Sequence, residues 1–288
     1  MQIFNSVEEL ESLKNNKIIG SENLKMNNSR IMFGGTGNIL IVEEGVTLNN
    51  SKIEFRFDNS VVYLSSSKHV YYLNVTVYRE SVCFIGKNNY MNGALNIIAS
   101  ERRHVFIGDS GLFSFGVWIR TADPHLIYST VNKKRINPSK SVYIGDHVWL
   151  GQNVLVLKGT RICSGSIIGA GAVCTGKETP SNEAWGGNPA HRVSKDLFWD
   201  SGCVHGYTYD DTESSGEMNT DKYIFKANAA TLPFAALDEV FSSERTPEEK
   251  LEYIESLIEN KTKDRFASKG NASAALKRRI NKKLRGKK

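Results

Sequence analysis

The segment "VYIGDHVWLGQNVLVLKGTRICSGSIIGAGAVCTGK", residues 142–177, consists of six consecutive hexads. The third position of each hexad is apolar, and the first position is small or β-branched. Glycine follows the apolar residue in three hexads, where the chain can turn tightly because glycine lacks a Cβ. The apolar third positions are Ile144, Leu150, Val156, Ile162, Ile168 and Cys174.

A period of six excludes an α-helix, whose apolar period is about 3.6 residues. It is typical of a β-solenoid, in which short strands alternate with corners and one apolar side chain per side points inward. The same spacing recurs upstream, with four extra residues between its two halves, and the chain before residue 80 is less regular but rich in β-branched residues. The upstream positions are Ile85, Met91 and Ile97, then Ile107, Phe113 and Ile119.

Length and composition indicate a folded, intracellular chain. Its 288 residues, 40% of them hydrophobic, are enough for one large core or two modest ones. There is no apolar run of about 18 residues, and the N-terminus lacks the basic start and apolar stretch of a signal peptide. Cys83, Cys163, Cys174 and Cys203 form no C-x-x-C pair, so we expect free thiols in a reducing cytoplasm.

The basic charge is concentrated at the C-terminus. Residues 261–288 contain twelve Lys and Arg and one Asp, a charge of +11, whereas the whole chain carries +6 and the remainder therefore −5. Such a tail would attract a polyanionic carbohydrate or an anionic membrane surface, or it is simply a solvated end. No nucleic-acid recognition motif accompanies it, so we expect no nucleic-acid partner.

The hexads break off at "WIRTADPHLIYS", residues 118–129. The next inward position after Ile119 would be His125, and an imidazole buried in an apolar tube is unfavourable unless it is fully hydrogen-bonded. We therefore expect the chain to leave the solenoid in a loop at about 123–141. From the spacing alone, His125 is either a structural histidine at the base of this loop or a functional one.

The hexads, the "ADPHLIYS" loop and the closing "GGNPAHRV" together resemble the hexapeptide-repeat acyltransferases. The resemblance is strong over residues 80–195 and weak over 35–80. Within that superfamily the sequence is similar to sugar O-acetyltransferases, in particular those that acetylate sialic acid in bacterial capsules. It implies an all-β, left-handed parallel β-helix, a homotrimer and acetyl-CoA as co-substrate; we expect no metal, because the spacing of the histidines does not support a zinc site.

This resemblance and the sequence pattern together predict that the chain has three parts, the last of which contains a helix. A C-terminal helix is predicted by Thr246 as N-cap, Pro247 at the first helical position and Glu249 completing a capping box. Its apolar stripe is Leu251, Ile254, Leu257 and Ile258. The parts are an N-terminal cap segment at 1–33, the β-helix at 34–193, and an extension at 194–288 with a helix at about 246–260 and the basic tail.

Acetyl transfer to a sugar hydroxyl requires a general base, and histidine is suited to this because its side-chain pKa is about 6.5. The resemblance makes His125 the candidate base. Asp123 is a candidate to orient its imidazole, although Asp-Pro also opens turns. Trp149 should point outward because it neighbours the inward Leu150. In similar enzymes a Trp at this place lies beside the catalytic histidine; the alternative is packing between subunits.

The donor site is expected along the small residues of "SIIGAGAVCTGK" and in "GGNPAHRV". The small residues would let an extended pantetheine arm lie against the backbone, although tight solenoid corners require small residues in any case. The charged candidates would meet CoA phosphates. The predicted cofactor-binding residues are Gly151, Gly169, Ala170, Gly171, Lys177, Asn188, Pro189 and Arg192.

We therefore expect a cytoplasmic enzyme that moves acetyl from acetyl-CoA to a hydroxyl of a bacterial surface carbohydrate, with a capsular polysaccharide or sialic acid as acceptor. Peripheral association with the inner face of the membrane through the tail is an additional expectation. The alternatives are transfer to another sugar or amino sugar, a non-catalytic trimeric scaffold with a basic binding arm, and a β-helical hydratase with a zinc site. No histidine spacing supports a zinc site.

Overall fold

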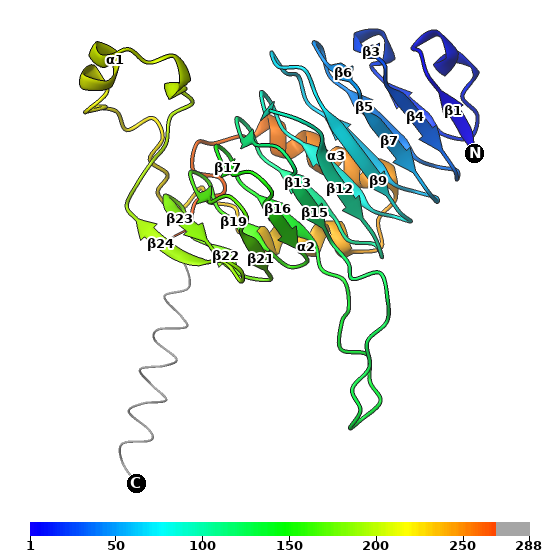
Figure 1. The fold of residues 1–288 in the computed structure, drawn as a ribbon. Coiled ribbons are helices and arrows are strands. Elements are labelled where there is room, and N and C mark those ends of the chain that lie inside the picture. The colour runs from blue at the N-terminus through cyan, green and yellow to red at the C-terminus, as the bar shows by residue number, and fades with distance from the viewer. Residues whose placement is uncertain (269–288) are drawn as a thin grey trace.

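The computed structural model describes residues 1–268 and shows a tube of parallel strands with three faces (Figure 1). Successive strands of each coil belong to successive sheets, and each strand pairs with the strand one coil away. Three consecutive hexads thus make one complete coil. Ile144 is aligned with Ile107 in the preceding coil and with Ile162 in the following coil.

Two eight-stranded sheets and one six-stranded sheet form the three faces. The first sheet consists of β1 (Gln2–Phe4), β4 (Arg30–Phe33), β7 (Lys52–Phe55), β9 (Leu73–Val77), β12 (Leu95–Ala99), β15 (Trp118–Arg120), β18 (Leu155–Leu157) and β21 (Val173–Thr175). The second consists of β2 (Lys17–Ile19), β5 (Ile39–Val42), β8 (Val61–Leu64), β10 (Val82–Ile85), β13 (Val105–Ile107), β16 (Val142–Ile144), β19 (Arg161–Ile162) and β22 (Glu178–Thr179). The third consists of β11 (Tyr90–Met91), β14 (Leu112–Phe113), β17 (Trp149–Leu150), β20 (Ile167–Ile168), β23 (Glu183–Gly186) and β24 (His191–Lys195). The short pair β3 (Lys25–Asn27) and β6 (Thr47–Asn49) is a separate two-stranded sheet; along the chain each of its strands follows a strand of the second sheet and precedes one of the first, as the strands of the third sheet do in later coils.

The predicted inward positions form the core. All six apolar third positions of residues 142–177 are buried, one on each of the strands β16 to β21. The upstream positions from Ile85 to Ile119 are buried in the same way on β10 to β15. Removing this column of apolar side chains from water stabilises the fold by about 25 cal/mol per Å² of buried apolar surface. This burial is the main force that holds the tube together.

The early coils are longer than three hexads. Hydrogen bonds between equivalent residues span 18 positions in the late coils, as from the Asp146 N–H to the Ser164 hydroxyl, but 22 in the early ones, as from the Ser60 N–H to the Asn38 side-chain oxygen. The extra residues explain why the hexad pattern looks irregular before residue 80.

Residues 1–33, predicted to be a cap, include part of the coils. The strands β2 and β4 pair in parallel with β5 and β7, so the first coil begins at about Lys17. Only the residues before it close the end of the tube: β1 pairs antiparallel with β4, and the 3₁₀ turn η1 (Glu8–Ser12) inserts the buried Leu10.

The C-terminal extension folds back over the outer face of the second sheet (Figure 1). The predicted helix is α3 (Pro247–Glu259), and its capping box is present: the Glu249 N–H donates to the Thr246 hydroxyl, and the Thr246 N–H donates to the Glu249 carboxylate. Leu251 and Ile254 are buried against outward side chains of the second sheet, together with Phe234 and Phe266. The extension therefore removes one of the three faces of the tube from solvent.

Two further helices lie in the extension, in or next to a segment whose sequence looks irregular and polar. They are α1 (Tyr209–Ser214), which is exposed, and α2 (Phe234–Ser242), which packs on the second sheet; η2 (Ser21–Asn23) and η3 (Val204–Gly206) are single turns. Within residues 1–268 no helix has both the length and the apolar character needed to cross a bilayer. Most of the predicted basic tail, residues 269–288, lies outside the described residues.

Candidate active site

The chain leaves the coils between β15 and β16 in a long loop that stands away from the tube (Figure 1). Its two arms are joined by backbone hydrogen bonds, including those from the N–H of Ile136 to the carbonyl of Ile127 and from the N–H of Ser129 to the carbonyl of Lys134. Because β15 belongs to the first sheet and β16 to the second, the loop leaves the tube at the edge between these two sheets. We call this edge the loop edge.

His125 lies at the neck of the loop, the part next to the tube where the two arms converge. Its side chain is exposed rather than packed in the core. Its backbone carbonyl accepts a hydrogen bond of 2.8 Å from the amide of Asn137. Within residues 1–268, the imidazole itself makes no hydrogen bond. The ring is therefore free to act on a molecule that reaches the loop.

Asp123 holds the neck to the tube. Its carboxylate accepts a hydrogen bond of 2.5 Å from Lys158 and one of 3.3 Å from Asn137. The hydrogen bond from Lys158 is the main reason that the pKa of Asp123 lies below its usual value. Neither of these bonds reaches the imidazole of His125, so in this chain the carboxylate fixes the loop rather than the ring.

The other residues of the neck are not apparent from the sequence pattern. Asn137 is buried and contacts both arms of the loop. Glu101 accepts hydrogen bonds from Arg135 (2.9 Å, Nη2 to Oε2) and from Ser139, and these bonds lower its pKa to about 2. The only local sequence sign of this neck is Asn-Pro at 137–138, a dipeptide that favours turns.

Trp149 points outward from β17, as predicted, and its side chain is partly exposed. Its ring lies 6.0 Å from that of Trp199 in the C-terminal extension, measured between centroids. The strand belongs to the third sheet, and the third sheet lies opposite the loop edge in a three-sided tube. Within one chain, the structure therefore does not bring Trp149 to His125.

His147 anchors the extension beside Trp149. Its ring stacks between Trp199, at 3.9 Å, and Tyr223, at 4.4 Å between centroids. The indole N–H of Trp199 donates to the His147 carbonyl, and the imidazole Nε2 of His147 lies 3.0 Å from the Trp199 carbonyl. Burial in this stack lowers the pKa of His147. Its contacts hold the extension in place.

The predicted donor residues fall on different parts of the tube. Six of them lie where the third sheet passes into the first, which we call the glycine edge: Gly151, Gly169, Ala170, Gly171, Asn188 and Pro189. Lys177 lies between β21 and β22, on the loop edge, and Arg192 lies on β24, paired with Glu183 at 3.3 Å. One chain alone therefore does not gather all of these residues into one site.

The glycine edge is smooth, and its glycines differ in what they permit. A Cβ on Gly151 would lie 2.6 Å from the backbone nitrogen of Ala170, so glycine is required there for the coils to stack. A Cβ on Gly171 would meet nothing within 4 Å, and both Gly171 and Ala170 are exposed. This edge can accept an extended thioester arm without obstruction by large side chains.

The cysteines are poor candidates for a nucleophile. Cys83, Cys163 and Cys174 are buried, and burial raises the pKa of the Cys83 and Cys174 thiols to about 12. Cys203 is exposed and lies in the extension. In the described part of the chain, no three His, Cys, Asp or Glu side chains are grouped so that they could hold a metal ion.

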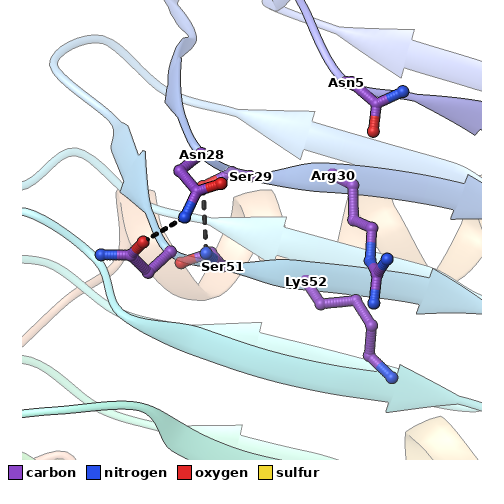
Figure 2. A pocket seen from close by; sticks show the side chains of 7 residues that line it. Asn5, Asn28, Ser29, Arg30, Ser51 and Lys52 are labelled. Atoms are coloured by element: carbon purple, nitrogen blue, oxygen red, sulfur yellow. Dashed lines mark hydrogen bonds between the residues drawn. The ribbon is translucent and has the colours of Figure 1, made fainter.

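A hollow of about 370 Å³ lies far from the loop, on the N-terminal coils (Figure 2). Its floor is tied together by hydrogen bonds from Asn28 to Asn50 and from the N–H of Ser51 to the Ser29 hydroxyl. Arg30 and Lys52 extend beside it from neighbouring strands. No predicted site residue lines this hollow.

Comparisons with known proteins agree with this geometry. Residues 141–176 match the sequence model of the bacterial transferase hexapeptide, which spans six repeats. Together with the three-faced parallel coil, this match confirms the predicted left-handed β-helix, and the enzyme is similar to the hexapeptide-repeat O-acetyltransferases.

The similar proteins of known name are more specific. The chain is 29% identical over 198 residues to the polysialic acid O-acetyltransferase of Neisseria meningitidis, covering 68% of this chain and 91% of the relative. It is 29% identical over 126 residues to that of Escherichia coli O1:K1, of which it covers only 40%. The crystal structure of the polysialic-acid-specific acetyltransferase NeuO matches 70% of this chain and 92% of its own, with a TM-score of 0.60 and 29% identity. That of the polysialic acid O-acetyltransferase OatWY matches 70% and 95%, with a TM-score of 0.57 and 25% identity.

Proposed function

We propose that this enzyme transfers acetyl from acetyl-CoA to a hydroxyl of a sialic-acid-containing bacterial surface carbohydrate, with polysialic acid as the first acceptor to test. The observation that carries the proposal is the exposed His125 at the neck of the one long loop that interrupts the hexads, in a chain similar over most of its length to polysialic acid O-acetyltransferases.

The reaction is direct transfer. The acceptor hydroxyl loses its proton to the imidazole of His125 as its oxygen attacks the thioester carbonyl. The carbon–sulfur bond then breaks, and the leaving thiolate takes the proton back from the imidazolium. The burial of Cys83, Cys163 and Cys174 supports a mechanism without an acyl-enzyme.

We propose that the site is completed by a second copy of the chain in a homotrimer. His125 lies in the loop that leaves the tube at the loop edge, whereas Trp149 and the glycine edge lie on the other side of the tube. A neighbouring subunit would therefore supply them. The second sheet is covered by the extension, which leaves the first and third faces for this contact. Acetyl-CoA would then lie along the glycine edge, with Lys177 and Arg192 as candidates to meet its phosphates. Because acetyl-CoA is the donor, we place the enzyme in the cytoplasm.

The test is release of free thiol from acetyl-CoA with a panel of polysialic acid, monomeric sialic acid, a galactoside and an amino sugar. We expect activity with the sialylated acceptors and a loss of about 10²–10⁴-fold in His125→Ala, because general-base catalysis contributes about this factor. His205→Ala, which changes another exposed histidine, is the matched control. Full activity of His125→Ala would contradict the proposed mechanism.

A neutral sugar is the second candidate acceptor. The chain is 36% identical over 110 residues to the galactoside O-acetyltransferase of Lactococcus lactis, although it covers only 52% of that protein. Thiol release with the galactoside and not with sialylated glycans would favour this acceptor.

A further inference from the structure

Asn137 lies at the point where the two arms of the loop converge. Its side chain is 5% exposed, although most of the loop around it is exposed. It comes from the returning arm, twelve residues after His125, and lies against the outgoing arm. A polar side chain buried in this way must satisfy its hydrogen-bonding groups locally.

Both ends of the Asn137 amide are used. The nitrogen donates to the His125 carbonyl at 2.8 Å and to the Asp123 carboxylate at 3.3 Å. The oxygen accepts from the Ile127 N–H at 2.9 Å. An amide has two N–H donors and an acceptor oxygen. No other side chain of this size offers two donors together with an acceptor. The residue thus holds the backbone directly after His125, at the His125 carbonyl and the Ile127 N–H, and the side chain of Asp123 before it.

The neck is also tied to the coils. Lys158, at the loop edge, donates to the Asp123 carboxylate at 2.5 Å and to the backbone carbonyl of Asn137 at 3.2 Å. The hydrogen bonds therefore run without a break from a coil of the tube, through Asn137, to the backbone of His125.

We propose that Asn137 is a positioning residue, which sets the backbone at His125 and so fixes where its imidazole lies relative to the substrates. This inference rests on the proposed role of His125 as the general base. Misplacing a reacting group by about 1 Å can cost about 10²-fold in rate, so the hydrogen bonds of Asn137 should affect the chemical step.

The test compares Asn137→Asp with Asn132→Asp. Both replace one amide by a carboxylate in the same loop, but Asn132 is exposed near the tip, where its oxygen accepts from the Lys134 N–H and an aspartate can do the same. Asn137→Asp loses both donors and places a negative charge against the His125 carbonyl and Asp123. Asn137→Ser adds no charge and is too short for its single hydroxyl to replace the two donors of the amide, and it serves if the first variant does not fold.

We expect kcat to fall by about 10²-fold in Asn137→Asp and Asn137→Ser, while KM for acetyl-CoA and for the acceptor changes less than about threefold. Asn132→Asp should keep kcat within about threefold of the original. A kcat that is preserved in both Asn137 variants would overturn the proposal. The proposal would also be overturned if the fall in kcat came with an equally large rise in KM and a lower melting temperature. Asn137 would then be only structural.

A second readout does not depend on activity. The NMR signal of the His125 imidazole, assigned by its absence in His125→Gln, should move in the Asn137 variants and not in Asn132→Asp. An unchanged signal would contradict the positioning role. If instead His125→Ala remains fully active, the general-base mechanism fails, while the NMR result still shows whether Asn137 positions the ring.

Discussion

Trp149 is the exposed aromatic side chain whose role matters most among single residues. It stands outward on β17 and contacts Trp199, which leaves one part of the indole open. We propose that this part packs on the acceptor sugar or the thioester.

Trp149→Ala should therefore lower kcat/KM for the acceptor by about tenfold or more, because an aromatic contact contributes about 0.5–1.5 kcal/mol beyond the area that it buries. The measurement is steady-state kinetics with mass determination of the assembly. Tyr209→Ala is the control, since Tyr209 is an exposed aromatic residue of α1 in the extension and lies on neither the first nor the third sheet. A smaller assembly with unchanged kcat/KM would show that Trp149 serves packing between subunits.

His104 makes stability depend on pH. Burial, with smaller effects from Lys250 and Arg103, holds its pKa well below the usual value. Its Nδ1 accepts a hydrogen bond from the Val82 N–H at 3.0 Å, and a proton on Nδ1 would break this bond. Below about pH 6.5 the unfolded chain gains a proton here that the folded chain does not, so stability falls as the pH falls.

The free energy of unfolding should accordingly drop by up to about 1.4 kcal/mol per pH unit below pH 6.5 through this site. His104→Asn keeps an acceptor near Val82 but cannot titrate, so urea unfolding between pH 7.5 and 5.5 should show a shallower decline. His205→Asn, an exposed histidine, should leave the slope unchanged. The same slope in all three proteins would refute this explanation.

At the scale of elements, a buried ion cluster joins the C-terminal extension to the edge between the second and third sheets. Arg265 is almost fully buried and contacts Asp146 at 2.6 Å and Asp109 at 3.3 Å, while Lys261 also binds Asp109. Phe266, next in the chain, packs into the layer of α2 and α3. The first residues of the predicted basic tail are therefore part of the fold.

Arg265→Met should lower the free energy of unfolding by about 3–5 kcal/mol, because among the described residues it leaves the two buried carboxylates with Lys261 as their one ion-pair partner. Chemical denaturation measures this loss. Arg103→Met should cost less than about 1 kcal/mol, because the Arg103 guanidinium donates to the Ser242 hydroxyl at the surface. Equal costs for the two variants would mean that the cluster does not hold the extension.

The elements also show which features a single sequence can predict. The hexads of residues 142–177 determine both the sheet and the inward face, because each apolar residue recurs at a fixed step along the chain. The capping box of α3 is local as well. The contacts at the neck of the loop are not local in the sequence. Asp123 contacts Asn137 and Lys158 at separations of 14 and 35 residues, which no periodicity encodes. Nor does the pattern indicate that the donor residues lie on different edges.

For the whole molecule, the fold limits how the tail can be tested. Removing residues 261–288 would also delete Arg265 and Phe266, which are buried. Removing only 269–288 should leave activity on monomeric sialic acid within about twofold. We expect it to weaken binding to vesicles of anionic lipid, since each basic residue near such a surface contributes about 1 kcal/mol. A large loss of activity on the monomer would contradict a separate targeting role.

The central claim is that His125 of one subunit works with Trp149 of another, and mixing two impaired variants tests it most directly. His125→Ala and Trp149→Ala would be co-expressed in equal amounts and the mixed assemblies assayed for acetyl transfer. If each site is shared between subunits, about a quarter of the sites in a random mixture regain both side chains, so activity should rise to about a quarter of the original. Activity no higher than the average of the two separate variants would contradict a shared site.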